Sequence, residues 1–238
     1  MIKSTFDLEN QLIADGYEFI IGIDEAGRGP LAGPVVASAV CFKTSDVFIG
    51  LRHPMSKLIR DSKMLSEKQR ESLFDFIHEY FHVGVGICDH KTIDRINILE
   101  ATFLAMKAAV TDLKKARKRF DQASRFNLRI AKGYIKVEPR MIILLDGNKK
   151  IPNLSIEQKA IVNGDKFVKS ISAASIVAKV TRDRIMREMH EKFPQYNFAQ
   201  HKGYGTKLHF EMLEKNGPCE IHRQSFAPVK SALRKRIE

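Results

Sequence analysis

The residues with the clearest capacity for chemistry are two adjacent carboxylates, Asp24 and Glu25. They follow the apolar run 19–23, which predicts a strand that ends in two acids. Carboxylate oxygens bind hard divalent cations such as Mg²⁺. The next segment, Gly27-Arg28-Gly29, joins a flexible backbone to a guanidinium and can bring donors close to a phosphate. Metal ligands beside a phosphate-binding turn favour phosphodiester chemistry, whereas a turn of this composition alone is common.

Two further aspartates are expected to reach the same place. Asp146 ends the apolar run 141–145 and is followed by glycine. If this strand and the strand that ends at Asp24 are parallel neighbours, their carboxyl ends meet at one sheet edge, where open α/β sheets bind ligands. Asp165 follows a short apolar run and is expected to enter this edge from the next element. Glu25 would join only if the chain turned there, because adjacent strand residues face opposite sides.

Four carboxylates at one edge would repel one another unless cations neutralise them. The sequence therefore predicts two Mg²⁺ or Mn²⁺ ions. Such a pair, roughly 3.5–4 Å apart, activates a water and stabilises a leaving oxygen. A single Asp-Gly is more often only a turn, so the hypothesis depends on the convergence of several acids.

Two loops carry residues suited to nucleic acid. Lys63, in Asp61-Ser62-Lys63, is expected to reach a backbone phosphate, and the alternative is that this loop only makes local turn hydrogen bonds. Tyr204 stands between two glycines, which would leave its ring exposed to a ligand. A phenol there can stack on a base or sugar, or bond a 2′-hydroxyl. An ordinary glycine-rich turn is the alternative.

The hydrophobic pattern predicts the elements that must hold these residues. Strands are expected at 17–24, 35–42, 82–88, 140–146 and 160–163. Helices are expected after a capping box at Ser66, at 98–118, 172–190 and 207–216, and from 229. Strands come first and mix with helices, so we predict an α/β fold with a mixed sheet flanked by helices. We divide the chain into a leader (1–16), a catalytic domain (17–190) and a helical C-terminal subdomain (191–238).

Charge and composition narrow the class of partner. Lys and Arg number 40 against 28 acids, which gives a net charge of +12 and favours an anionic polymer such as nucleic acid, with a generally basic protein as the alternative. Apolar runs are too short to span a bilayer, and no secretory signal is recognisable. The three cysteines are far apart and predict free thiols in a reducing cytoplasm.

The stretch 114–136 holds nine basic residues and one acid, and is either a phosphate-contacting arm or a solvated extension.

Other polar residues are expected to be structural. The eight histidines lack metal-ligand spacing and are predicted to be solvated or structural. Ser172 and Ser175 lie among small residues that would let a helix pack closely on the sheet, and no histidine can be assigned to activate either as a nucleophile.

Taken in order along the chain, these segments closely resemble ribonuclease HII. The resemblance runs from about 17 to 232, and its long stretches are highly specific. The matching stretches are 22–34, Asp61-Ser62-Lys63, Leu145-Asp146-Gly147-Asn148, Gly164-Asp165, 172–183 and 193–204.

The resemblance implies a ribonuclease H-like mixed sheet with flanking helices and a helical C-terminal part. It implies endonucleolytic hydrolysis of RNA in RNA–DNA hybrids, including incision at single ribonucleotides embedded in duplex DNA. The products would carry 5′-phosphate and 3′-hydroxyl ends. A monomer in the cytoplasm, with no membrane partner, is the expected form.

The resemblance also implies roles for particular residues. Asp24, Glu25, Asp146 and Asp165 resemble the metal-site carboxylates, for Mn²⁺ or Mg²⁺. The segment Gly27-Arg28-Gly29 resembles the loop that reads the RNA–DNA junction, and Tyr204 resembles the ring that detects the 2′-hydroxyl. Asp183 matches the family pattern too and is expected to be structural.

Three alternatives remain at this point. The sister type, ribonuclease HIII, usually carries an N-terminal substrate-binding domain, for which the leader is too short, but a preference for continuous hybrids stays open. A catalytically silent hybrid binder would be expected to lack some of the four carboxylates. A phosphatase for small esters would leave the charge of +12 and the exposed Tyr204 unexplained.

Overall fold

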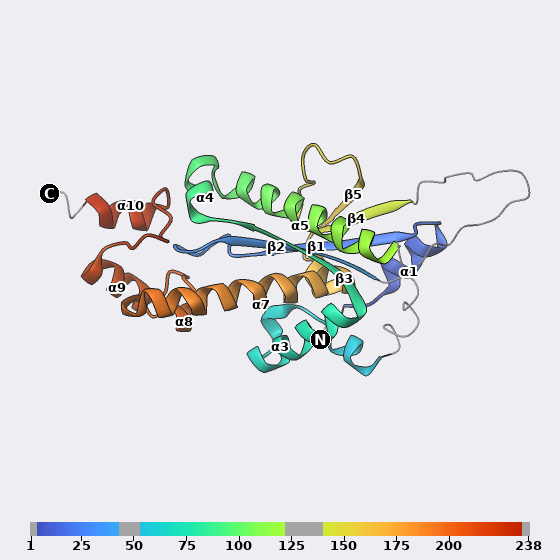
Figure 1. Cartoon of the computed structure of the whole chain (residues 1–238), viewed down its shortest axis with the longest axis horizontal. Helices are drawn as coiled ribbons and strands as arrows, with labels where there is room; N and C mark the ends of the chain where they lie inside the picture. Colours follow the sequence, from blue (N-terminus) through green and yellow to red (C-terminus); the bar gives the residue numbers. More distant parts are fainter. Residues whose placement is uncertain (1–3, 43–52, 122–139, 235–238) are drawn as a thin grey trace, which may run out of the picture.

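One mixed sheet forms the centre of the molecule (Figure 1). The structure is a computed structural model and describes residues 4–42, 53–121 and 140–234. The sheet order is β3-β2-β1-β4-β5. The strands are β1 (Phe19–Ala26), β2 (Val35–Phe42), β3 (Phe81–Cys88), β4 (Met141–Asp146) and β5 (Glu157–Ile161). The β1–β2 and β2–β3 pairs are antiparallel, whereas β4 runs parallel to β1 and β5 runs parallel to β4.

Helices cover both faces of this sheet (Figure 1). On one face α4 (His90–Ile96) leads into α5 (Ile98–Asp121), which packs on β2 and β3. On the other face α7 (Lys169–Lys192) packs on β1 and β2, with α3 (Glu67–Tyr80) beside it. The predicted α/β class with a mixed sheet flanked by helices is therefore confirmed.

Shorter elements complete the described chain. They are α1 (Asp7–Ala14), the 3₁₀ helices η1 (Pro54–Leu58), η2 (Ser62–Met64) and η3 (Pro194–Tyr196), and the helices α6 (Gly164–Phe167), α8 (Phe198–His201), α9 (Lys207–Asn216) and α10 (Ala227–Arg234). The elements from η3 onward gather at one end of the molecule and form the predicted helical C-terminal part (Figure 1).

Alternation along β1 divides its side chains between the two faces. Ile21 and Ile23 belong to the core under α5, and Ile20 belongs to the core on the opposite face. At Gly22 the backbone of α7 comes so close that a Cβ atom would lie 2.1 Å from the carbonyl carbon of Ser170. Asp24 lies two residues beyond Gly22 and so faces α7 as well.

Several predicted elements are confirmed at their own boundaries. The strand at 35–42 and the helix at 207–216 are found at those residues. Ser66 forms the predicted capping box, since its hydroxyl accepts from Gln69 N at 3.2 Å and its own N–H donates to the Gln69 side chain at 2.9 Å.

Other element boundaries differ from the sequence expectation by one to three residues, and three of these shifts bear on the site or its supports. β1 continues through Glu25 to Ala26, because both residues still pair with β2, so the chain does not turn at Glu25. β5 begins at Glu157 rather than at 160. Its first three residues are polar and pair with β4, so the apolar pattern did not reveal them. α7 begins at Lys169 rather than at 172. Its N-cap residue, Val168, makes no side-chain cap, so the sequence carried no capping signal for the true start.

The remaining predictions concern the domain boundaries, the basic stretch, the cysteines and membrane-spanning helices. α7 runs to Lys192 through the proposed boundary at 190, and the division into leader, catalytic domain and C-terminal subdomain stays a prediction. Residues 114–121 continue α5, and the rest of the basic stretch lies outside the described residues. Cys41, Cys88 and Cys219 do not form disulfides with one another. Among the described helices, none has the length and apolar character needed to cross a bilayer.

Candidate active site

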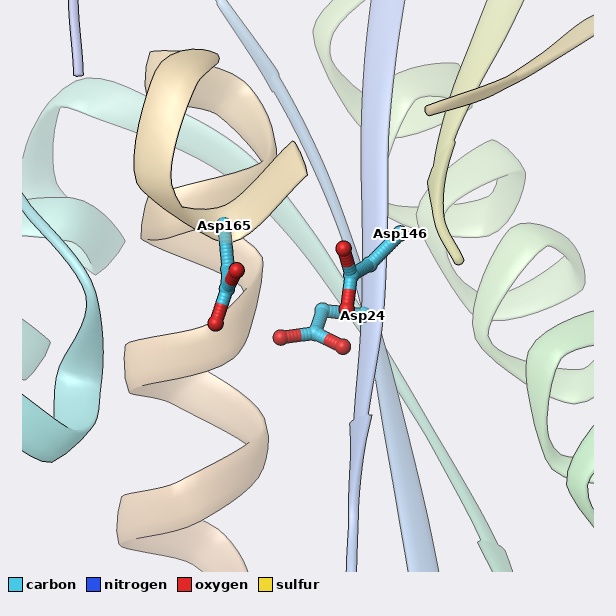
Figure 2. A group of neighbouring side chains, drawn as sticks. All are labelled: Asp24, Asp146 and Asp165. Atoms are coloured by element: carbon cyan, nitrogen blue, oxygen red, sulfur yellow. The ribbon is translucent and has the colours of Figure 1, made fainter. Parts of the chain in front are cut away.

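Three aspartates converge at the carboxyl ends of β1 and β4. These strands are parallel neighbours in which Ile23 pairs with Leu145, so Asp24 and Asp146 emerge side by side. Asp165 approaches from α6, directly after β5. One oxygen from each carboxylate lies within 4.8 Å of the other two. Figure 2 shows the three side chains directed toward a common space, which we call the carboxylate cluster.

Burial makes the carboxylate cluster electrostatically unfavourable by itself. The exposed fractions of Asp24 and Asp165 are 5% and 3%. Burial raises the pKa of Asp24 well above its ordinary value, and the charges of Glu25 and Asp146 raise it further. The pKa of Asp146 is raised by burial and by the charge of Asp165, against the opposing effect of nearby backbone N–H groups. Its Oδ1 atom is buried and has no hydrogen-bond partner among the residues that the structure describes. A buried acceptor among like charges suits a hard divalent cation.

Lys63 supplies part of the missing positive charge. Its Nζ lies 3.3 Å from Asp165 Oδ2, and its side chain is still 76% exposed. The backbone N–H of Lys63 donates to Asp61 Oδ1 at 2.9 Å. The local turn bond considered as an alternative is therefore formed, and it aims the lysine at the site.

Glu25 lies beside the carboxylate cluster rather than within its group of three. Its backbone N–H donates to Asp24 Oδ1 at 2.7 Å, and its carboxylate pairs with Arg28 Nη1 at 3.1 Å. Burial raises the pKa of Glu25, while the guanidinium of Arg28 opposes that rise. Glu25 thus lines the same cleft as Asp24 from within the continuous strand β1, without the turn that was expected from the alternation of strand side chains.

A cleft opens next to the carboxylate cluster and shares Asp24 with it. Its lining is Asp24, Glu25, Ala26, Gly27, Arg28, Gly29, Ser62, Lys63, Ser175, Lys179 and Tyr204. Seven of the nine residues singled out from the sequence belong to this lining, and Asp146 and Asp165 adjoin it through Asp24. The fold therefore brings all nine together from segments that are far apart in the sequence.

Tyr204 stands at the rim of the cleft, over the glycine-arginine turn. Its Cε1 would lie 4.0 Å from a Cβ built on Gly29, and the residue is 42% exposed. The Arg182 guanidinium carbon and Lys179 Nζ lie 5.7 and 5.8 Å from the ring centroid, within the range of cation–π contact. The ring is thus partly exposed, as predicted, and two cationic side chains contact it.

Four lining residues were not assigned to the site from the sequence, and two of them, Ser175 and Lys179, lie on α7. Ser175 shares a hydrogen bond of 2.9 Å with Ser62, and its hydroxyl also bonds Asp24 and lowers that pKa. Its interpretation as a small packing residue was therefore incomplete. Lys179 pairs with Asp183 at 2.8 Å, a supporting contact that agrees with the structural role expected for Asp183. The available signal was that Ser175 and Lys179 lie one helical turn apart in a mainly apolar stretch.

The fold is of the ribonuclease H class, and its carboxylate cluster offers the oxygen ligands that a divalent metal ion prefers. The structure matches the ribonuclease H2 from Pyrococcus horikoshii with a TM-score of 0.64 and 23% identity, over 92% of this chain and 99% of that chain. It also matches Bst-RNase HIII, solved in complex with Mn²⁺, with a TM-score of 0.59 and 18% identity, over 92% of this chain and 70% of that one. At these identities the likeness concerns the fold.

Sequence comparison identifies the family within this class. The family model for ribonuclease HII matches residues 21–229. A ribonuclease HII from Caldicellulosiruptor bescii is 48% identical over 225 residues, which are 94% of each chain. The chain belongs to the ribonuclease HII family. It is a metal-dependent endoribonuclease, and its family acts on RNA–DNA hybrids.

Proposed function

We propose that this enzyme, besides cleaving the RNA strand of hybrids, incises duplex DNA at single embedded ribonucleotides. The observation that carries the proposal is the shared cleft, in which Tyr204 lies over Gly29 while Asp24 lines the same wall. A ring that can bond or stack on the sugar at a 2′-hydroxyl, next to the reacting carboxylates, suits recognition of one ribose. The reaction would contribute to the removal of ribonucleotides from DNA.

The carboxylates would hold the metal ions. Asp24, Asp146 and Asp165 supply buried oxygens, one of which has no partner in the described ranges, and Glu25 supplies a fourth acid in the cleft lining. Four negative charges exceed what one divalent ion neutralises, which supports two Mn²⁺ or Mg²⁺ ions. Bound there, such ions would activate the attacking water and stabilise the leaving 3′ oxygen.

Residues of the chain itself would position the substrate. Arg28, Lys63 and Lys179 give the cleft three cationic side chains that can contact phosphates along the cleaved strand. The glycines of Gly27-Arg28-Gly29 let a sugar-phosphate backbone approach closely. Hydrolysis between the contacted phosphate and the 3′ oxygen would leave 5′-phosphate and 3′-hydroxyl ends.

The state and location of the enzyme are also proposals. We expect a monomer, and light scattering tests this. We assign it to the cytoplasm because its three cysteines do not form disulfides with one another.

The decisive experiment uses three labelled duplexes with Mg²⁺, Mn²⁺ or EDTA. They are a DNA duplex with one ribonucleotide, an all-DNA duplex and a continuous RNA–DNA hybrid. We expect one nick at the ribonucleotide with either metal, and none with EDTA or on all-DNA. Cleavage of the continuous hybrid alone would favour the specificity of the HIII type, and tight binding without cleavage would favour a silent binder.

A further inference from the structure

The segment after the glycine-arginine turn is enclosed by the C-terminal part of the chain. Leu31 N donates to Gly203 O at 2.8 Å, and Arg223 N donates to Leu31 O at 2.8 Å. Gly33 N donates to Ile221 O at 2.9 Å. The turn is therefore anchored between two loops that lie about 170 to 190 positions later in the sequence.

Arg223 reaches the turn itself from this enclosure. The residue is fully buried, and its Nη2 donates to Gly27 O at 2.6 Å and to Pro34 O at 3.2 Å. Its Nη1 donates to Arg28 O at 3.0 Å, and its Nε donates to Gly33 O at 3.0 Å. One guanidinium thus holds both ends of the segment 27–34 by their carbonyl groups.

These contacts fix the direction of two backbone donors. In a trans peptide the carbonyl of one residue and the N–H of the next point in opposite directions. Because the carbonyls of Gly27 and Arg28 point to Arg223, the N–H groups of Arg28 and Gly29 point away from it. Those two residues line the cleft, so Arg223 sets which backbone donors the turn can offer a substrate.

Arg182 gives the second support, to the Tyr204 side. It is also fully buried, and donates to Pro34 O at 2.9 Å, Ala32 O at 3.0 Å and Lys202 O at 3.0 Å. Lys202 begins the loop that carries Tyr204, whose ring lies 5.7 Å from this guanidinium. Arg182 therefore ties the turn and the Tyr204 loop to one side chain of α7.

Both side chains remain charged at neutral pH. Burial lowers the pKa of Arg182 to about 10 and, with the charge of Arg182, that of Arg223 to about 9. A planar guanidinium offers five N–H donors in a fixed fork, whereas an ammonium offers three donors at a single point. Arg223 bonds four carbonyls, which is more than the three N–H donors of an ammonium can serve.

We propose that Arg223, supported by Arg182, is a positioning residue for recognition of the ribonucleotide–DNA junction, because it fixes the Gly27-Arg28-Gly29 turn against Tyr204. The inference rests on the proposed function of that turn. The described hydrogen bonds of both guanidinium groups go to backbone carbonyls and not to the carboxylate cluster, so we expect metal binding to be independent of the pair. Selection of an embedded ribonucleotide depends on it, whereas cleavage of a continuous hybrid, which offers a ribose at every step, depends on it less.

The test compares Arg223→Lys and Arg182→Lys with Arg187→Lys. Arg187 lies on α7 like Arg182 and pairs with Glu67 and Glu71 away from the cleft, so it is a matched control. Both kcat and KM are measured on the single-ribonucleotide duplex and on the continuous hybrid, with Mn²⁺ affinity by calorimetry and Tm by thermal unfolding. For Arg223→Lys we expect kcat/KM on the single-ribonucleotide duplex to fall at least about tenfold more than on the hybrid, since small misplacements at reacting groups are costly. Mn²⁺ affinity should stay within about twofold of wild type, as should both activities of Arg187→Lys.

Each outcome decides the question. Equal losses on both substrates, or an unchanged ratio in a folded variant, would overturn the positioning role. If Arg223→Lys does not fold, Arg182→Lys decides by the same ratio, and unfolding of both would assign the pair to stability alone. Failure of the wild-type enzyme to nick at a single ribonucleotide would refute the proposed function, which is a separate result from an unchanged ratio in the variants.

Discussion

The carboxylate cluster and the pair of buried arginines, Arg182 and Arg223, are two concentrations of like charge inside one protein. The cluster holds three acids, Asp24, Asp146 and Asp165, and the largely exposed Lys63 forms an ion pair with Asp165. The arginines also lie near each other, since the charge of one lowers the pKa of the other. The N–H groups that the arginines use all donate to backbone carbonyls, however, whereas Asp146 Oδ1 has no hydrogen-bond partner within the described part of the chain.

The difference separates a structural charge from a functional one. A buried charge that is fully hydrogen-bonded stabilises the arrangement that bonds it, and truncating it leaves several carbonyls without donors. A buried charge that lacks partners is costly in the folded state, and a ligand of opposite sign relieves that cost. The first kind holds the cleft in shape, and the second kind is where the chemistry is expected.

The strongest test of this contrast removes one cluster carboxylate. Asp146→Asn should lower kcat/KM by about a thousandfold or more, roughly 4 kcal/mol of transition-state stabilisation, because the metal would no longer be held correctly. Hybrid binding measured with Ca²⁺ or without metal should change little, since phosphate contacts remain. Asp75→Asn, an exposed acid on α3, is the control. Near-normal turnover of Asp146→Asn in Mg²⁺ would refute the assignment, and the same test applies to Asp24→Asn.

The second test disturbs the arginine side. Gly27 has a φ of +101°, and a Cβ there would lie 2.1 Å from Arg182 Nε and 2.7 Å from Pro34 O. Gly27→Ala should therefore cost roughly 3 kcal/mol of unfolding free energy and at least about tenfold in cleavage. Gly147→Ala is the matched control, because Gly147 has a φ of +92° with nothing within 4 Å of its Cβ position. Its loss, measured by denaturant unfolding, should be only about 1 kcal/mol. Equal losses would mean that the packing around Arg182 is not rigid.

The third test uses metal as a probe of stability. At about a hundred times its Kd, Mn²⁺ should stabilise the wild-type protein by about 2.7 kcal/mol, seen as a rise in Tm. Asp146→Asn should lose most of this gain. Without metal the same variant should be about 1 kcal/mol more stable than wild type near neutral pH, because a repelling charge is gone. A variant that is less stable without metal would contradict the view that the carboxylate cluster is unfavourable by itself.

The smallest expected effect is a pH dependence from histidines behind the Tyr204 loop. His209 and His222 are buried, with their Nε2 atoms 3.0 Å apart. Burial lowers the pKa of His209 to about 4, and burial together with the charge of His209 lowers that of His222 to about 3. The unfolded chain therefore binds protons first, and this stability is complete above about pH 6.5 and is lost as pH falls toward 4.

The cluster carboxylates act with the opposite sign, because their raised pKa values let the folded state bind protons first. His222→Asn should thus reduce the loss of unfolding free energy between about pH 7 and pH 4.5 by about 2 kcal/mol. His78→Gln, at an exposed site on α3, should leave the pH dependence unchanged. Denaturant unfolding at the two pH values measures both, and identical pH profiles of His222→Asn and wild type would exclude the histidine origin.

Much of the site was accessible from local pattern. An acid that ends an apolar strand is visible in the sequence, and parallel pairing of β1 with β4 then brings Asp24 and Asp146 to one edge. Lys63 and Tyr204 were found because glycines and turn residues mark loops that can meet a ligand. The predicted turn at Glu25 was wrong, since Glu25 and Ala26 still pair with β2 and the strand continues to Ala26.

The sequence by itself determined the chemistry: strand ends with carboxylates, a glycine-arginine turn, exposed basic residues and the family to which they belong. Only the tertiary structure decided which charges serve that chemistry and which hold it in place. Arg182 and Arg223 look like any of the 40 basic residues, because their partners are backbone carbonyls up to 196 positions away. His209 and His222 resemble solvated histidines for the same reason. Burial and hydrogen-bond completion are properties of the assembled core, and no local pattern of residue types encodes them.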